Sequence, residues 1–195
     1  MVRRGINTST CPPVSCAPAF GDFQSKAGFD HDDRTVPFHL FDQIEHCETC
    51  LGVIPRVGTG VRAPNGTESR ILVRDTWNTD IVSDLKPEPA DSLIYKHRFS
   101  GFYETDLDAK LKGLGARYLI FTGCTTSVCV ESTVRDAMFR DYSPLLLADC
   151  TGEPVGYGLP RSNHEASLLL IETTLSWVSS SKQFIKALES PALST

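Results

Sequence analysis

The chain has 195 residues, of which 41% are hydrophobic and 22% charged, and its formal net charge is -5. This length and composition predict one globular domain with a single core. The negative charge gives no reason to expect nucleic acid or an anionic membrane surface as a partner. No apolar run approaches the roughly 20 residues that cross a bilayer, and Arg3 and Arg4 precede no apolar signal segment. We therefore expect no membrane partner.

The seven cysteines are odd in number and scattered along the chain. This distribution favours reduced thiols in a cytoplasmic protein over a disulfide framework. A structural zinc site is the alternative, because Cys47 and Cys50 form a C-x-x-C pair and Cys11 and Cys16 form a second pair. Two prolines in the gap of that second pair, and no other sign of order nearby, argue against it. We expect no metal.

The first part of the chain differs from the rest. Prolines before residue 20 argue against a central strand there. Apolar residues between positions 36 and 51 recur at roughly helical spacing, and residues 52–57 are compatible with a short strand. We expect residues 1–60 to form an atypical N-terminal segment and residues 61–190 to form the main part of a single domain.

Beyond this segment, short apolar runs alternate with helical patterns. Such alternation is typical of a three-layer α/β/α sandwich with a mainly parallel, Rossmann-like sheet. A loop rich in Gly and Pro is expected over 151–160. The expected strands are 92–96, 117–122 and 144–149, and the expected helices are 105–115, 127–141, 163–177 and 181–188.

Cys129 lies just after the point where the apolar run 118–122 breaks at Gly123 and a helical pattern begins. The dipole and the unpaired N–H groups of a helix start stabilise a thiolate, which is the reactive form of cysteine. The same N–H groups can hold the oxyanion that forms when a thiolate attacks a carbonyl. The segment therefore predicts a nucleophile. A buried structural cysteine is the alternative, since free cysteine is often buried.

The run Gly123-Cys-Thr-Thr-Ser-Val-Cys129-Val-Glu-Ser-Thr133 resembles the nucleophile motif of the isochorismatase-like cysteine hydrolases. Upstream, Lys96-His-Arg-Phe-Ser-Gly-Phe102 is similar to the lysine segment of that family. The pattern K-x-R-F-S-x-F is closest to the ureidoacrylate and biuret type of amidohydrolase. The resemblance extends from about Val61 to Leu188 and implies the α/β fold expected above.

The resemblance also implies an activity: hydrolysis of a small amide or ureide C–N bond through a thioester on Cys129. Lys96 would be the cation that favours the thiolate. A non-proline cis peptide between Cys124 and Thr125 would turn the Thr125 N–H toward the oxyanion, alongside the N–H of Cys129. The family needs no cofactor for this chemistry, and the resemblance implies a homo-oligomer.

Several aromatic and histidine residues are candidates for the substrate pocket or for a metal. Phe99 and Phe102 would form the wall of a pocket for a small planar substrate, although aromatic residues near a strand end are more often core. Trp77, in a loop segment that also resembles the subgroup, is a third candidate for this wall. His97 and His164 lack a metal-ligand spacing.

The N-terminus departs from the family pattern. Members of this family open with an apolar strand that ends in an aspartate, the general base of a Cys-Lys-Asp triad. Here Asp22-Phe23 is similar to the pair that follows this strand, which places the aspartate position on Pro18. We expect the strand around residues 10–20 to be atypical or missing, in a rebuilt N-terminus or in a truncated or mis-spliced version of a longer relative. Asp22 is the best substitute for the base. The alternative function is a catalytically impaired or dead member that keeps the fold for binding or assembly.

Overall fold

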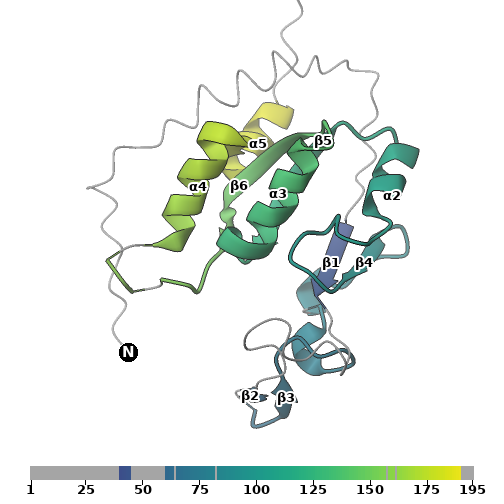
Figure 1. Cartoon of the computed structure of the whole chain (residues 1–195), viewed down its shortest axis with the longest axis vertical. Helices are drawn as coiled ribbons and strands as arrows, with labels where there is room; N and C mark the ends of the chain where they lie inside the picture. The colour runs from purple at the N-terminus through teal and green to yellow at the C-terminus, as the bar shows by residue number, and fades with distance from the viewer. Residues whose placement is uncertain are drawn as a thin grey trace, which may run out of the picture.

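The computed structural model describes the backbone of residues 40–44 and 78 and, with side chains, residues 60–63, 65–77, 79–81, 83–156, 158–160 and 162–189. Strands and helices alternate along most of this length (Figure 1). The strands are β1 (Leu40–Ile44), β2 (Gly60–Arg62), β3 (Glu68–Arg70), β4 (Ser92–Lys96), β5 (Tyr118–Cys124), β6 (Ser143–Gly152) and β7 (Trp177–Ser179). The helices are α2 (Leu107–Gly113), α3 (Glu131–Met138), α4 (Asn163–Thr174) and α5 (Ser181–Glu189), with a π-helical segment at Thr126–Val130.

The strands pair mainly in parallel, as the sequence predicts. β5, β6 and β7 form one parallel sheet in that order, and β1 pairs in parallel with β4. The register of β1 and β4 places Ile44 opposite Lys96. β2 and β3 form a small antiparallel hairpin. The carboxyl ends of β5 and β6 point the same way, as they do in sheets that bind ligands at this edge.

Helices cover both faces of the β5–β6–β7 sheet and make three layers (Figure 1). Leu146 of β6 packs with α3 and α4 on one face, while Leu145 and Leu147 pack with α5 on the other. Successive side chains of a strand point to opposite faces, so a run of apolar residues predicts a strand buried on both sides. All three leucines are buried.

α2 covers the region beside β4. Its residues Leu107 and Leu111 pack against Ile94 of β4 in a second core cluster, which α3 also joins. The hydroxyl of Thr105 accepts a hydrogen bond from the Leu107 N–H at 3.3 Å, and the helix is followed by Gly115 with φ +67°. The stop predicted at Gly115 is confirmed, whereas the helix begins at Leu107 with Asp106 as its N-cap, two residues after the expected start.

Three elements differ from the sequence predictions. Helical spacing is present between positions 36 and 51, yet residues 40–44 form strand β1, because pairing with β4 outweighs the local pattern. The helix expected to reach residue 177 ends at Thr174, and Trp177–Ser179 forms β7 against β6. The hairpin β2–β3 was not predicted.

The loop expected over 151–160 begins later than predicted, because Thr151 and Gly152 extend β6 by pairing with Gly123 and Cys124. The strands considered at 10–20 and 52–57 lie outside the described residues. Within the described part of the chain, no helix is long and apolar enough to cross a membrane.

Candidate active site

Cys129 lies in the first helical turn after β5. The chain leaves the strand at Cys124, passes Thr125 in extended conformation and enters the π-helical segment that continues into α3. The Thr125 carbonyl accepts hydrogen bonds from the N–H groups of Val128 at 3.2 Å and Val130 at 3.1 Å. The predicted order of strand, turn and helix is thus confirmed, and the Cys129 side chain is half-buried in it.

The peptide bond between Cys124 and Thr125 is cis, as the sequence motif predicts. Neither residue is proline, and such bonds are rare outside X–Pro sequences. The bond lies four residues before Cys129, at the end of β5.

Lys96 is the last residue of β4 and is only 2% exposed. Its Nζ donates a hydrogen bond to the Phe99 carbonyl at 2.9 Å. A buried ammonium is stable only where polar groups replace its water shell. The position, at the carboxyl end of a parallel strand, is where α/β sheets place ligand-binding groups. Lys96 is therefore not an ordinary surface lysine, and its catalytic role stays a prediction.

Two side chains, one from the β6–α4 connection and one from the first turn of α4, contact the start of the Cys129 helix. The N–H of Ser127 donates to Glu153 Oε2 at 2.7 Å, and the hydroxyl of Thr126 shares a hydrogen bond with His164 Nδ1 at 2.9 Å. Burial alone would raise the pKa of Glu153, but the hydrogen bonds from Ser127 and Val155, together with nearby His164, lower it below its usual value. A carboxylate is favoured at a helix N-terminus, so Glu153 acts as a cap supplied from a distant loop.

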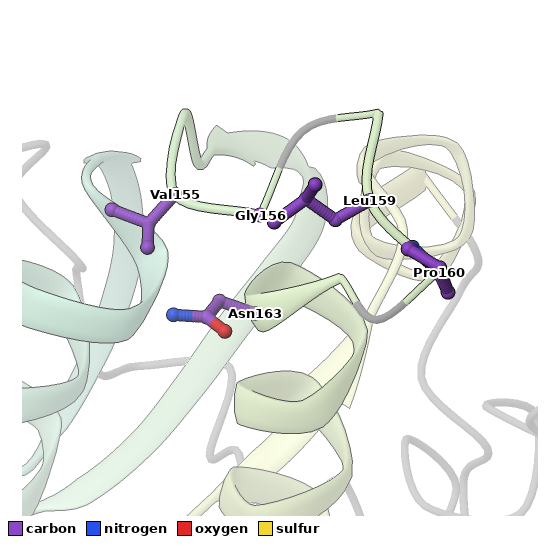
Figure 2. A pocket seen from close by; sticks show the side chains of 5 residues that line it. All are labelled: Val155, Gly156, Leu159, Pro160 and Asn163. Carbon is purple, nitrogen blue, oxygen red and sulfur yellow. The ribbon is translucent and has the colours of Figure 1, made fainter.

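An open apolar pocket of about 460 Å³ lies in the same connection (Figure 2). The loop passes over the N-terminal end of α4, where Asn163 is the first residue. Asn163 precedes His164, which contacts Thr126, in the first turn of α4. Its lining residues are Val155, Gly156, Leu159, Pro160 and Asn163.

Phe102, one of the predicted pocket residues, lies in the core. It is 5% exposed, and its ring stacks on Tyr142 with centroids 5.9 Å apart. The guanidinium of Arg140 lies 4.9 Å from the centroid of the same ring. These contacts favour the core alternative for Phe102.

The other predicted residues have different surroundings. Trp77 and Phe99 are partly exposed, and neither lines the pocket at the β6–α4 connection. Asp22, the candidate base, lies outside the described residues. Its role stays a prediction.

A metal site finds no support in the described ranges, where no group of three or more His, Cys, Asp or Glu residues could hold an ion. His97 pairs with Glu104 at 3.0 Å, and His164 contacts Thr126. The four cysteines considered for zinc lie outside the part of the chain that the structure describes.

The sequence analysis did not identify four residues whose side chains form hydrogen bonds between the segments of the site. They are Ser100, Thr133, Glu153 and His164. Ser100 and Thr133 stand inside the two motifs, and Thr133 follows Cys129 by four residues, a spacing that places both on one helix face. Their contacts with other elements were not visible from this spacing. Glu153 and His164 gave no local signal, because their partners are 26 and 38 residues away in the chain.

Comparison with known proteins shows the family of the chain. Residues 57–183 match the model of the isochorismatase domain, which is well over half of the chain. The chain belongs to the isochorismatase family. A ureidoacrylate amidohydrolase (RutB) of Methylobacterium radiotolerans is 43% identical over 124 residues, which cover 64% of this chain and 46% of that protein. The chain thus spans about half the length of the curated relatives it matches.

Solved structures of the family share the fold. An isochorismatase-like hydrolase from Alkaliphilus metalliredigens superimposes with a TM-score of 0.64 at 26% identity, covering 95% of this chain and 92% of that one. A cysteine hydrolase from Pseudomonas syringae pv. phaseolicola gives a TM-score of 0.56 at 30% identity, over 61% of this chain and 59% of that one. The α/β fold expected from the sequence is therefore confirmed.

Proposed function

We propose that this chain hydrolyses the C–N bond of a small amide or ureide through a thioester on Cys129. One observation carries the proposal. The Thr133 hydroxyl donates to the Cys129 carbonyl at 2.7 Å and accepts from the N–H of Gly101, five residues after buried Lys96, at 3.0 Å. A cysteine in a first helical turn and a buried lysine thus belong to directly connected segments. The ureidoacrylate amidohydrolase name of the relatives supports the substrate class.

The reaction would proceed in two halves. The Cys129 thiolate attacks the substrate carbonyl carbon, and the N–H groups of Thr125 and Cys129 hold the resulting oxyanion. The C–N bond then breaks, and the nitrogen leaves as ammonia or an amine after gaining a proton. Water attacks the thioester carbon, the C–S bond breaks, and the acid is released with the thiol restored. Lys96 contributes the positive charge that favours the thiolate.

The general base is proposed to be one of two aspartates. Asp22 follows from the sequence motif. Asp42 follows from the structure, because its backbone lies on β1 opposite Ile94, two residues before the position paired with Lys96. An apolar Leu-Phe pair before Asp42 is the sequence signal for it. Separate Asn variants of the two residues identify the base by which of them abolishes turnover.

The test is release of ammonia from a panel of ureides, biuret, nicotinamide and carbamoyl amines. We expect turnover of a ureide or biuret and its complete loss in Cys129→Ser. Cys150→Ser is the matched control, since Cys150 is exposed on β6. Hydrolysis that survives in Cys129→Ser would contradict the proposal. A folded chain that hydrolyses nothing would instead support a catalytically impaired member that keeps the fold for binding or assembly.

We also propose a cytoplasmic homo-oligomer acting on a small molecule, in keeping with the family resemblance. Light scattering of the purified chain measures the oligomeric state. A monomer at micromolar concentration would contradict it.

A further inference from the structure

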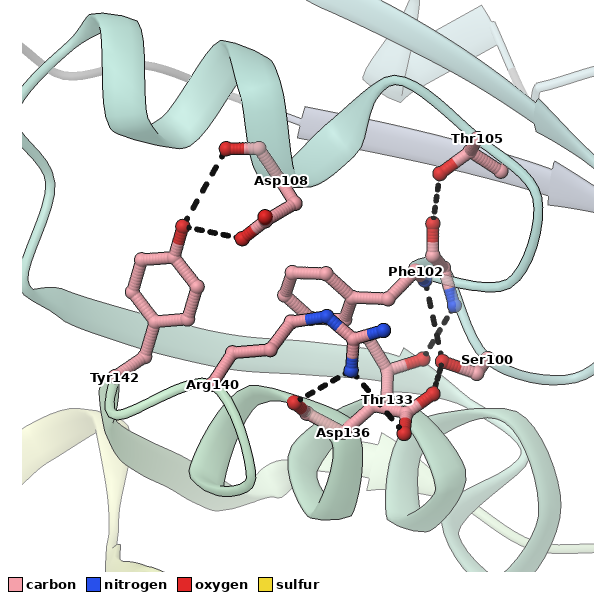
Figure 3. Close-up of polar contacts among 9 residues, drawn as sticks. Ser100, Phe102, Thr105, Asp108, Thr133, Asp136, Arg140 and Tyr142 are labelled. Atoms are coloured by element: carbon pink, nitrogen blue, oxygen red, sulfur yellow. Dashed lines mark hydrogen bonds and ion pairs between the residues drawn. The ribbon is translucent and has the colours of Figure 1, made fainter.

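The loop that follows Lys96 is bonded to α3 by a chain of polar contacts (Figure 3). The hydroxyl of Ser100 donates to Asp136 Oδ2 and accepts from the N–H of Phe102 at 3.1 Å. The carbonyl of Asp136 in turn accepts from Arg140 Nη1 at 3.0 Å. Ser100 is buried, and it joins segments 36 residues apart in the sequence.

Thr133 makes a second link a turn earlier on the same helix. Thr133 is 6% exposed, and its hydroxyl donates to the Cys129 carbonyl and accepts from the Gly101 N–H. The first bond is the ordinary bond of a helical Thr to the carbonyl four residues back, and the second ties the helix to the Lys96 loop. A buried N–H group without an acceptor would carry its full desolvation penalty. The bond from the Gly101 N–H to the Thr133 hydroxyl avoids this penalty, so this geometry is strongly favoured.

The loop between Lys96 and Gly101 is therefore fixed at its far end. The Lys96 ammonium donates to the Phe99 carbonyl inside this loop, so a shift of the loop moves the acceptor that holds the ammonium. Electrostatic stabilisation of a thiolate falls with the distance between the charges.

We propose that Ser100 and Thr133 are positioning residues that fix the Lys96 ammonium relative to the Cys129 thiol. The inference rests on the proposed function, because it takes Cys129 as the nucleophile and Lys96 as its cation. The two residues act through Lys96 and do not touch the substrate.

The experiment measures the rate at which iodoacetamide alkylates Cys129 in the full chain at neutral pH, followed by mass spectrometry of its peptide. Lys96→Met should slow this rate about tenfold, which corresponds to one pKa unit in the thiol. Thr133→Val should slow it by a similar factor, and Thr133→Ser, which keeps the hydroxyl, should restore it. In the double variant, Thr133→Val should add nothing to Lys96→Met, because coupled residues give non-additive effects.

Thr173→Val is the matched control. Thr173 makes the same bond to the carbonyl four residues back, at 2.8 Å, but on the exposed side of α4. Its substitution should leave the Cys129 rate unchanged. Ser100→Ala provides a second variant should Thr133→Val not fold. Its effect on the alkylation rate should likewise not add to that of Lys96→Met in the double variant.

Two results would overturn the inference: unchanged rates in the Thr133 and Ser100 variants, or effects that add fully to that of Lys96→Met. A purely structural role predicts the additive result. The proposed function is judged separately, by ammonia release in Cys129→Ser. Hydrolysis that depends on Cys129, combined with additive alkylation rates, would leave the proposed function standing and remove the positioning role.

Discussion

Exposure separates Cys129 from the two other cysteines that the structure describes. Cys124 and Cys150 are exposed, whereas Cys129 is half-buried. Access alone would favour reaction at the first two. Cys129 lies at a helix start, on a segment bonded to the loop after Lys96, and we expect both features to favour its thiolate form. Reactivity and access therefore make opposite predictions for this chain.

We expect iodoacetamide at neutral pH to label Cys129 ahead of the other six cysteines, because its thiol should be more acidic than the free value of about 8.5. Peptide mapping after partial labelling measures the order. Labelling that follows exposure, with Cys124 and Cys150 first, would show that the helix start does not activate the thiol.

Glu153 should contribute to stability in a pH-dependent way. Its pKa in the folded chain lies below the usual value of 4.5, so its contribution is present above that value and is lost as the pH falls through the folded pKa. Glu153→Ala should lower the free energy of unfolding by about 1 kcal/mol at neutral pH, as for loss of a helix cap. Urea unfolding at several pH values measures this.

Glu153→Gln is the control, since it keeps a hydrogen-bond acceptor but not the charge. The difference between the wild type and Glu153→Gln should shrink from about pH 5 toward about pH 3. A difference that is constant across this interval would mean that the carboxylate charge is irrelevant to the cap.

Strand β6 is the central element of the β5–β6–β7 sheet. It lies between β5 and β7 and has helices packed on both faces. Its consecutive leucines serve different layers: Leu146 faces α3 and α4, and its neighbours face α5. α3, which continues the helical segment that carries Cys129, is thus packed directly on the central strand of this sheet. Packing of β6 should matter for stability more than any surface contact of these helices.

Leu146→Ala should lower the free energy of unfolding by about 2–5 kcal/mol, because the side chain is fully buried and its loss leaves a cavity. Leu169→Ala on α4, where the side chain is 60% exposed, should change it by no more than about 0.5 kcal/mol. Chemical denaturation of both variants provides the comparison. Equal losses of unfolding free energy in the two variants would show that Leu146 is not part of the core.

For the molecule as a whole, we expect the N-terminal region to set the level of activity. Neither candidate base ends an apolar strand: Asp22 has no such strand before it in the sequence, and Asp42 lies in the middle of β1. A well-placed general base accelerates the reaction by a factor of about 10² to 10⁴, and part of this acceleration is lost when the base is misplaced. We therefore expect turnover of the chain as given to be weak.

Replacing residues 10–20 with an apolar strand that ends in aspartate should raise turnover of the best substrate in the ammonia assay. The same graft ending in asparagine is the matched control and should not. Asp22→Asn in the unmodified chain should change little. Turnover at the level of other family members, abolished by Asp22→Asn, would instead show that Asp22 is already the base.

Local pattern determined much of the fold and the centre of the site. The stop at Gly115 and the apolar runs of β5 and β6 act over a few residues, so α2, β5, α3 and β6 could be predicted. Cys129 and Lys96 were identified because each stands in a short motif at the end of an apolar strand.

Tertiary structure decided the rest. Residues 40–44 carry helical spacing but form β1, and the end of a predicted helix became β7, because the partners that pair with them lie far away in the chain. The same reason applies to the site. Neither the bond of Thr133 to Gly101 nor that of Glu153 to Ser127 has a local pattern, since each joins residues more than 25 positions apart. The sequence by itself predicted the nucleophile and its cation, and only the tertiary structure showed which distant residues bond to the segments that carry them.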